Sequence, residues 1–558
     1  MQWILLWLSA TFVGVWAGQR PNIVFILADD LGWNDVSFHG SRQIPTPNID
    51  TLAYDGIILN NYYVQPICTP TRAALLTGRH PIHTGLQHSV IANTQPYGLG
   101  LNETILPQYL KKLGYKTHIV GKWHLGMFAK EYTPIYRGFD SHLGYYQGKG
   151  DYWDHTDQGD RHDLRSWGLD FHRNGQVDKT AFGQYSTKVY TTETERIIAE
   201  HDTSKPLFLY LPHQAVHNAN PWRPREAPWE FIQRFSYIKH EGRRTFAAMT
   251  AVLDESIGNV TKALAARGML NNSIIVFSTD NGGPAHGFSD NFANNWPLRG
   301  VKETLWEGGV RASGFLWSPL LRKTSYVSEH MMQVIDWLPT LLSAAGFDMS
   351  KLPVSIDGID MWNMLSGNKE SRRTEMLHNI DPVPAGTGSS AIRIRDLKLV
   401  QGLDEPKWTG WYPPEGFAEN SSEMAPPEMF RSDLRPVLQR IGRRAPQGVP
   451  VVVKCGPRPA NASTNCDRHK APCLFNVTAD PCEFNNLANR LPALVTSLLA
   501  RLEEYNKTAV PKRNLPDDPK GLPYFHGGAW VPWIELGETA VTTSHMATKP
   551  SLVEEPKN

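Results

Sequence analysis

The sequence has almost no net charge and no internal repeat. Its 56 Lys and Arg residues nearly cancel its 55 Asp and Glu residues, which leaves a formal charge of +1 over 558 residues. No excess of positive charge therefore points to a nucleic acid or an anionic membrane surface as partner. Any anion that the protein binds must be held by a local site. The length favours two domains over one.

Long apolar runs are missing after the N-terminus. The exception, residues 1–18 (MQWILLWLSATFVGVWAG), predicts a signal peptide that is cleaved after Ala17 or Gly18. A membrane anchor is the alternative, but the stretch is short for a spanning helix and lacks flanking basic residues. No later segment is apolar enough to span a bilayer, and the polar C-terminus shows neither a GPI signal nor a KDEL-type sequence.

Seven N-x-S/T sequons fit passage through the secretory pathway. Although some sequons occur by chance, their number favours a surface that carries glycans. We therefore expect an extracellular or lysosomal protein. The acceptor residues are Asn102, Asn259, Asn271, Asn420, Asn461, Asn476 and Asn506.

Cysteine is scarce, and the five residues divide into a C-terminal group of four and one that stands alone. In an oxidising compartment the four would form two local disulfides, whose pairing the spacing leaves open. Zinc is the competing interpretation, but the short C-x2-C pairs of structural zinc sites are missing. The lone Cys68 is either a buried inert thiol or a chemically special one. The group of four comprises Cys455, Cys466, Cys473 and Cys482.

Short apolar runs alternate with helical patterns from residue 21 onward, which predicts an α/β fold with a largely parallel sheet. Residues 22–28 (NIVFILA) form a continuous apolar run, as expected of a strand buried on both faces. A proline inside residues 331–345 should kink the helix expected there. The other expected strands are 117–120, 207–211 and 273–278, and the other helices are 106–113, 244–264 and 491–505.

The composition changes near residue 380, where Pro, Gly and Ser become frequent. A strand-like segment, RIRDLKLVQG, lies between the irregular stretches and a helix follows. We therefore predict two domains, an α/β domain over residues 19–380 and a smaller α+β domain with long loops and a polar tail over residues 381–558.

Acidic residues follow two of the predicted strands. NIVFILA leads into Asp29 and Asp30, and the strand at 273–278 leads into Asp280 and Asn281. In open α/β sheets, ligands bind beyond the carboxyl ends of the strands, and the glycines after each pair allow the chain to turn there. Three carboxylates and an amide oxygen suit Ca2+ or Mg2+ better than zinc. Ordinary turn or capping chemistry is the alternative for each pair taken alone.

Basic groups follow two other predicted strands. Lys122 and His124 are two residues apart, so an extended backbone would place them on one face. The strand at 207–211 leads to His213 and His217. Each could be an ordinary surface residue, but together they would form a cationic, proton-transferring wall suited to a tetrahedral anion.

The surroundings of Cys68 favour the chemically special interpretation. In PICTPTRAALLTGRH, Pro70 suits the first turn of a helix, so Cys68 would lie just before the helix N-terminus. There the free N–H groups and the helix dipole favour negative charge. Arg72 adds a fixed cation one turn later. We therefore predict a reactive thiol.

Together these motifs resemble the sulfatase family. C-T-P-T-R fits C-x-P-x-R, the signature at which the family has its cysteine oxidised to formylglycine, and GKWHLG resembles the second family signature. The resemblance runs from PNIVFILADDLGWND through NNWPLRGVKETLWEGGVR to the C-terminal strand and helix, and in detail is strongest to the arylsulfatase B (N-acetylgalactosamine-4-sulfatase) branch. It implies a large mixed, mostly parallel sheet flanked by helices, as in alkaline phosphatase, and a smaller C-terminal α+β domain with a short antiparallel sheet.

The resemblance also implies one Ca2+ ion and a modified cysteine. The formylglycine-generating enzyme would be a partner during maturation. The calcium ligands would be Asp29, Asp30, Asp280, Asn281 and the modified Cys68.

The same resemblance implies roles for five further side chains. Arg72 would fix the formylglycine, and His124 would orient it and assist the release of sulfate. Lys122 would bind the sulfate. His217 and Lys302 (in LRGVKE) would bind sulfate and protonate the leaving alcohol. His213 has no counterpart and stays a pocket candidate.

The implied activity is the hydrolysis of aryl or carbohydrate sulfate esters. One hydroxyl of the formylglycine hydrate would attack sulfur, and the second would expel sulfate as the aldehyde reforms. An inactive sulfatase-like protein that binds sulfated glycans and a phosphatase or phosphonate hydrolase of the same superfamily are the alternatives. An unmodified cysteine hydrolase would leave both acidic pairs unexplained. Tryptophan-rich loops such as DYWDHTD could stack on a substrate or pack the domains together, so the substrate stays open between glycosaminoglycans, other sugar sulfates and aryl sulfates.

Overall fold

A ten-stranded mixed sheet forms the centre of the computed structural model, which describes residues 20–159, 164–353, 355–381, 388–402, 406–414 and 423–537. The predicted signal peptide and the end of the polar tail lie outside these residues. In order across the sheet, the strands are β13 (Tyr326–Ser328), β2 (Ile57–Leu59), β12 (Gly314–Trp317), β11 (Ser273–Thr279), β1 (Asn22–Ala28), β10 (Leu207–Pro212), β4 (Lys116–Lys122), β5 (Ser141–Tyr145), β8 (His172–Arg173) and β9 (Gln176–Val177).

The middle of this sheet is parallel, from β11 through β1, β10 and β4 to β5. Antiparallel pairs follow on both sides. Every residue of β1 is buried, and its side chains alternate between two apolar cores. This explains the continuous apolar run, because a strand covered on both faces has no polar side. The predicted mixed, mostly parallel sheet is confirmed.

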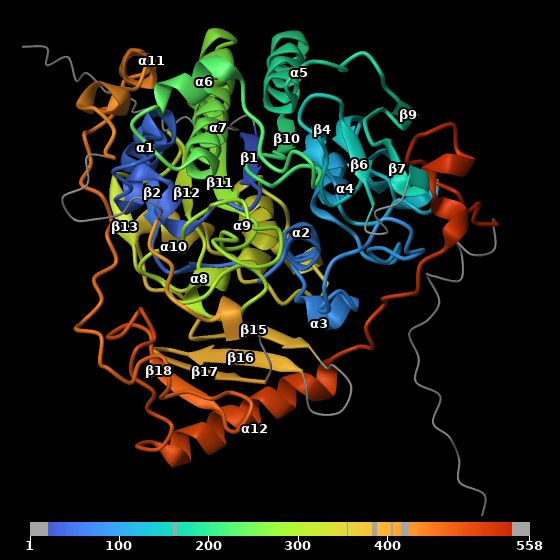
Figure 1. The fold of residues 1–558 in the computed structure, drawn as a ribbon. Helices are drawn as coiled ribbons and strands as arrows, with labels where there is room; N and C mark the ends of the chain where they lie inside the picture. Colours follow the sequence, from blue (N-terminus) through green and yellow to red (C-terminus); the bar gives the residue numbers. More distant parts are fainter. Residues whose placement is uncertain are drawn as a thin grey trace, which may run out of the picture.

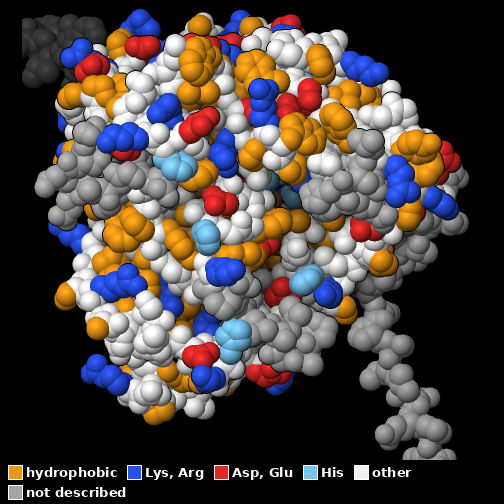
Figure 2. All heavy atoms as spheres, viewed as in Figure 1, with side chains coloured by type: hydrophobic (Ala, Val, Ile, Leu, Met, Phe, Trp, Pro, Cys, Tyr) orange, Lys and Arg blue, Asp and Glu red, His pale blue; other side chains and the backbone are white. Residues whose placement is uncertain are grey.

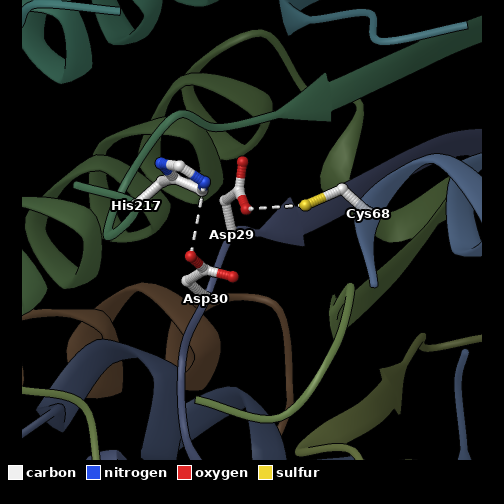
Figure 3. Close-up of side chains that lie close together, drawn as sticks. All are labelled: Asp29, Asp30, Cys68 and His217. Carbon is white, nitrogen blue, oxygen red and sulfur yellow. Dashed lines mark hydrogen bonds and ion pairs between the residues drawn. The ribbon is translucent and has the colours of Figure 1, made fainter. Parts of the chain in front are cut away.

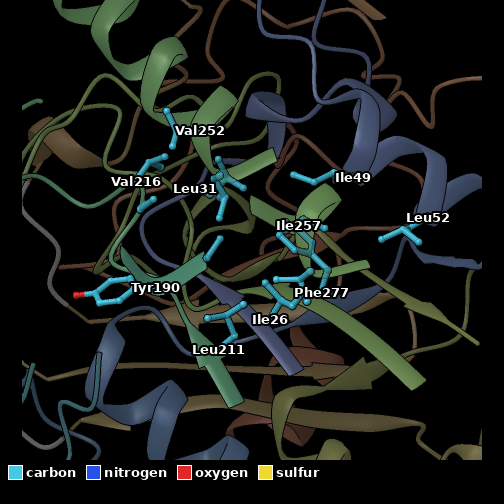
Figure 4. Close-up of a cluster of buried hydrophobic side chains, with 14 of the residues drawn as sticks. Ile26, Leu31, Ile49, Leu52, Tyr190, Leu211, Val216, Val252, Ile257 and Phe277 are labelled. Carbon is cyan, nitrogen blue, oxygen red and sulfur yellow. The ribbon is translucent and has the colours of Figure 1, made fainter. Parts of the chain in front are cut away.

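Helices cover both faces of the sheet (Figure 1). Figure 4 shows one of the two cores, in which Ile26, Leu211 and Phe277 of the sheet meet Ile257 and Leu52 of the helices. The helices on this face are α1 (Pro47–Asp55), α5 (Ser186–Glu200), α6 (Trp229–Arg234), α7 (Glu241–Ala266) and α11 (Leu434–Arg440). The helices on the other face are α2 (Cys68–Thr77), α4 (Leu106–Lys112), α9 (Trp337–Ala344) and α10 (Trp362–Gly367).

A smaller antiparallel sheet packs against the large unit (Figure 1). One of its faces contacts the large unit through Met376 and Phe475, and the other packs on Leu498 and Leu502 of the last helix. The predicted C-terminal antiparallel sheet and helix are therefore confirmed. The elements are β15 (Glu375–Asp381), β16 (Ser389–Ile394), β17 (Leu397–Gln401), β18 (Cys473–Asn476) and α12 (Pro492–Thr508).

Short elements complete the architecture. Two further strand pairs join β3 (Tyr62–Tyr63) to β14 (Met332–Gln333) and β6 (Thr156–Gln158) to β7 (Trp167–Leu169). Two short helices, α3 (Pro81–Thr84) and α8 (Glu307–Val310), lie near the smaller sheet.

The helix expected over residues 331–345 is shorter than predicted. Residues 332–333 form β14, and α9 begins only at Trp337. Pro339 consequently lies in the first turn, where its missing N–H has no helical partner to lose, so no kink is needed.

The predicted domain boundary at residue 380 falls inside β15, and the last described residues return to the large unit. Ala529 forms a bridge with Leu169, and the buried Trp530 donates from Nε1 to the Asp157 carbonyl over 3.1 Å. The division into two domains stays a prediction.

The four C-terminal cysteines form the pairs Cys455–Cys482 and Cys466–Cys473, so the two local disulfides are confirmed. On the face that Figure 2 shows, basic and acidic side chains are interspersed, in keeping with the small net charge. Among the helices of the described ranges, none has the length and apolar composition that crossing a membrane requires.

Candidate active site

The parallel pairing of β1 with β11 brings the two acidic strand ends together. The register places Ala28 opposite Thr279, so the residues that follow each strand are neighbours. The Asp30 N–H donates to Asp280 Oδ1 over 3.3 Å, and Asn281 Nδ2 donates to Asp30 Oδ1 over 2.7 Å. The turn after β1 occurs at Asp30 itself, whose φ of 57° is left-handed. The prediction that the glycine after the acidic pair provides this break is therefore wrong for β1, because Gly32 has an extended backbone.

These acidic residues have the properties of a cation site. Burial raises the pKa of Asp30, and burial together with Asp29 raises the pKa of Asp280. A cation among the carboxylates would offset the free-energy cost of keeping them ionised in this buried site. In the part of the chain that the structure describes, the buried side-chain oxygen of Asn281 receives no hydrogen bond, so it is free to bind a cation. The donor set of hard oxygens fits the metal that the sequence predicts.

Three buried basic side chains surround the carboxylates. Lys122 Nζ lies 2.6 Å from Asp29 Oδ2, and Lys302 Nζ lies 2.8 Å from Asp30 Oδ2. Arg72 Nη2 donates to Asp280 over 2.8 Å and to Asp29 over 3.3 Å. All six side chains are almost completely shielded from solvent. The centre therefore holds equal numbers of acidic and basic groups before any metal or anion is counted.

Cys68 points into this centre from the start of α2 (Figure 3). Its thiol lies 3.8 Å from Asp29 Oδ1. One potential metal-binding atom from each of Cys68, Asp29, Asp30 and His217 lies within 4.8 Å of the other three. Burial raises the pKa of the Cys68 thiol to about 12, against the attraction of Lys122 and Lys302. The cost of removing a thiolate from water therefore exceeds the helix-end and lysine contributions, and the reactivity of this thiol stays a prediction.

His217 and His124 are both neutral in this environment. Burial, with Lys302 and Lys122 nearby, holds the pKa of His217 well below its usual value. Its Nδ1 donates to the Asn218 carbonyl over 2.7 Å, so Nε2 is free to accept from Lys302 Nζ at 3.3 Å. Burial together with Lys122 and Arg72 likewise lowers the pKa of His124, whose Nε2 donates to the Ile91 carbonyl over 3.1 Å.

The comparisons with known proteins agree with this centre. The family model for sulfatases matches residues 21–347, which include all the acidic and basic residues above. The chain belongs to the sulfatase family. Mouse arylsulfatase J is 42% identical over 533 residues, covering 93% of this chain and 81% of the relative. Mouse N-acetylgalactosamine-6-sulfatase is 32% identical over 384 residues, covering 66% of this chain and 71% of the relative.

A solved structure has the same fold. The crystal structure of Ps i-CgsB superposes with a TM-score of 0.68 at 25% identity, covering 95% of this chain and 98% of that chain. The family resemblance is therefore confirmed, and the protein is a sulfuric ester hydrolase. The finer placement in the arylsulfatase B branch stays a prediction.

The pocket candidate His213 lies away from the centre of this sulfatase. Its Nε2 is 3.4 Å from Ser256 of α7, so the side chain faces the helices that cover the sheet. Burial lowers the pKa of His213 to about 3. β10 ends at Pro212 and the chain turns after it, so the side chains of His213 and His217 do not point to the same side.

Two residues near the sulfatase centre were not predicted from the sequence. Asn291 donates to the Asp30 carbonyl over 3.3 Å and to the Val216 carbonyl over 2.8 Å, which links the metal-site turn to the His217 loop. The Tyr152 hydroxyl donates to the His217 carbonyl over 2.8 Å. Both come from loops without strand or helix periodicity, so only a fold could place them.

Proposed function

We propose that this sulfatase hydrolyses the sulfate esters of carbohydrates or aryl alcohols with a formylglycine at position 68 and one Ca2+ ion. The observation that carries the proposal is the placement of Cys68. Its side chain begins a buried helix and faces Asp29 in a centre that contains Lys122 and Lys302. A thiol with a raised pKa is a poor nucleophile, so conversion to another group gives this position a function.

The calcium ligands in this proposal are Asp29, Asp30, Asp280, Asn281 and the oxygen of the modified residue 68. All five supply hard oxygen atoms, and the Asn281 oxygen has no donor among the described residues. When bound, Ca2+ supplies positive charge for the sulfate oxygens and for the ionised nucleophile. The ligand chemistry and the burial of the carboxylates support this choice over zinc.

A formylglycine hydrate supplies two hydroxyls on one carbon, one to attack sulfur and one to expel sulfate. Arg72 donates to Asp280 and Asp29 and thereby fixes the positions of these two carboxylates near residue 68. Because the three carboxylates and three basic groups cancel, a divalent cation leaves two positive charges. These match a singly charged sulfate ester and one ionised hydroxyl.

Lys302 and His217 form the proton-transferring pair. The nearby Asp30 raises the pKa of Lys302 although burial alone would lower it, so the ammonium keeps its protons. It donates toward His217 Nε2, the nitrogen that carries no proton in the neutral ring. Each of the two would bind the sulfate group, and the charged Lys302 or a protonated His217 would give its own proton to the leaving alcohol. Lys122 would hold a sulfate oxygen, and His124 would orient residue 68.

The secretory pathway is the proposed location, with the formylglycine-generating enzyme as a maturation partner. Among the sequons that the structure describes, Asn102, Asn271, Asn461 and Asn506 are exposed, which supports glycosylation. The similarity to a relative named N-acetylgalactosamine-6-sulfatase supports an amino-sugar sulfate as a substrate.

The mass of the peptide that carries residue 68 tests the proposal. The protein should be produced in a eukaryotic secretory host and digested, and the peptide compared with that of a Cys68→Ala variant. We expect an aldehyde or its hydrate at position 68. An unmodified thiol throughout an active preparation would contradict the formylglycine mechanism.

A further inference from the structure

Two exposed tryptophans lie beside the loop that carries His217. Trp167 begins β7 and is 43% exposed, and Trp222 lies five residues after His217 and is 50% exposed. Their ring centroids are 5.2 Å apart with an angle of 60° between the planes. Large apolar rings brought together from distant segments and left in water mark a binding surface.

Trp167 also lines a cleft of about 520 Å³. The cleft combines aromatic and aliphatic surface with a few polar groups, which is the usual make-up of a site for a small organic ligand. Its main lining residues are Trp167, Leu169, Phe182, Asp154, Asp178 and Lys179.

Hydrogen bonds connect this cleft to the active-site loop. Asn220 Nδ2 donates to the carbonyl of Thr156, a cleft residue, over 2.9 Å, and the Gln158 N–H donates to Asn220 Oδ1 over 2.8 Å. Asn220 follows His217 by three residues, so their Cα atoms are at most about 11 Å apart. The loop is held further by the bond from the Ala219 N–H to the Pro224 carbonyl, at 2.8 Å. The cleft therefore lies near the His217 loop, within the length of a ligand of several rings.

We propose that the cleft binds an uncharged sugar ring of a sulfated oligosaccharide whose sulfate ester lies at Cys68. This inference rests on the proposed function and names its substrate class. The flat apolar face of a sugar ring matches the exposed tryptophan surface, and carboxylates accept hydrogen bonds from sugar hydroxyls. Asp178 is paired with Arg173 at 3.0 Å, so Asp154 and Lys179 leave the cleft without net charge, which suits an uncharged ring better than one that carries sulfate or carboxylate. A one-ring aryl sulfate held at Cys68 leaves the cleft empty.

Kinetics with substrates of different length test the proposal. The probes are 4-nitrophenyl sulfate, N-acetylgalactosamine sulfates and tetrasaccharides from chondroitin, dermatan and heparan sulfate in which the second amino sugar carries no sulfate and is therefore uncharged. We expect at least one tetrasaccharide to have a higher kcat/KM than its monosaccharide. Trp167→Ala and Trp222→Ala should lower kcat/KM for that tetrasaccharide about tenfold more than for 4-nitrophenyl sulfate. Trp229→Ala, at a tryptophan that is 67% exposed on α6, is the matched control and should change neither.

Binding gives a second readout that does not depend on turnover. In a Cys68→Ala background, the same tetrasaccharides are titrated by calorimetry with and without each tryptophan substitution. A loss of affinity with either tryptophan substitution supports the cleft. The proposal is overturned if no tetrasaccharide binds or reacts better than its monosaccharide, or if the advantage survives in both variants. Failure of the proposed function would instead appear as no hydrolysis of any sulfate ester by the wild-type protein.

Discussion

Single atoms at the centre of this sulfatase serve several ion pairs at once. Asp29 Oδ2 accepts from both Lys122 and Arg72, and Arg72 also donates to Asp280. Such sharing is stable only while each charge keeps a partner, because an unpaired buried charge is costly. Substitution of one carboxylate should therefore affect metal binding, activity and stability together.

Asp280→Asn tests this coupling. Loss of one carboxylate weakens the cation site and removes the shortest partner of Arg72, so we expect loss of bound calcium and of activity. The free energy of unfolding should fall by about 3 kcal/mol. Metal analysis and urea unfolding measure the two effects. Asp254→Asn, at a buried aspartate that accepts from the Asn48 and Ile49 N–H groups far from the centre, is the matched control and should keep its calcium. Full calcium occupancy in Asp280→Asn would contradict the ligand assignment.

His213 offers a test of pH dependence. Burial lowers its pKa to about 3, whereas an unfolded chain has a histidine pKa near 6.5. Below pH 6.5 this histidine becomes protonated in the unfolded state but stays neutral in the folded state. The free energy of unfolding therefore decreases as the pH falls toward 3. When the pH falls from 7 to 5, the free energy of unfolding should decrease by about 2 kcal/mol less in His213→Gln than in the wild-type protein. Urea unfolding at both pH values measures this, and equal losses in both proteins would contradict it.

At the scale of secondary structure, a buried ionic cluster joins the smaller sheet to α8. Lys398 of β17 lies 2.8 Å from Glu307 and 3.0 Å from Glu483, and all three side chains are fully buried. Glu483 in turn accepts from the Glu307 N–H over 2.8 Å. Since α8 follows the segment that carries Lys302, the cluster connects the active-site side of the large unit to the C-terminal sheet.

Lys398→Met should remove the cation that two buried carboxylates share, and Arg311, 3.9 Å from Glu307, compensates only in part. We expect the free energy of unfolding to fall by about 3–5 kcal/mol. Lys188→Met is the matched control, because the Lys188–Glu230 pair is exposed and should contribute less than about 1 kcal/mol. Thermal or urea unfolding of both variants decides the matter, and equal effects would show that burial of the cluster adds nothing.

Elements with strong periodicity were predictable from the sequence, and irregular ones were not. β1 and α7 follow from an apolar run and from amphipathic spacing, and the acidic residues after β1 and β11 follow from strand order. The start of α9 did not follow, because an apolar stretch fits β14 and a helix equally well. The raised pKa of Cys68 depends on complete burial, which no local pattern specifies.

At the scale of the whole molecule, the chain returns to the large unit after the smaller sheet. Trp530 is fully buried, and its carbonyl lies 2.9 Å from His172 Nε2 at the far edge of the large sheet. The backbone N–H of Trp530 donates to the Leu169 carbonyl over 2.9 Å. The C-terminal segment therefore stabilises the β6–β7 region, which also carries Trp167.

Trp530→Ala should lower the free energy of unfolding by about 3–5 kcal/mol, because it leaves a large cavity and removes the hydrogen bond from Trp530 Nε1 to the Asp157 carbonyl. Trp229→Ala, which removes an exposed ring, should have a small effect. Urea unfolding curves for the two variants provide the measurement. Similar stability in both would mean that the C-terminal segment contributes little to the large unit.

The rates of hydrolysis of 4-nitrophenyl sulfate and 4-nitrophenyl phosphate by protein from a eukaryotic secretory host, with and without Cys68→Ala, test the central claim most directly. We expect the wild-type protein to prefer the sulfate, and the Cys68→Ala variant to remain folded but to lose at least about a thousandfold in rate. Sulfate hydrolysis that survives in folded Cys68→Ala would contradict catalysis by a group derived from Cys68. A preference for the phosphate would identify the protein as a phosphatase.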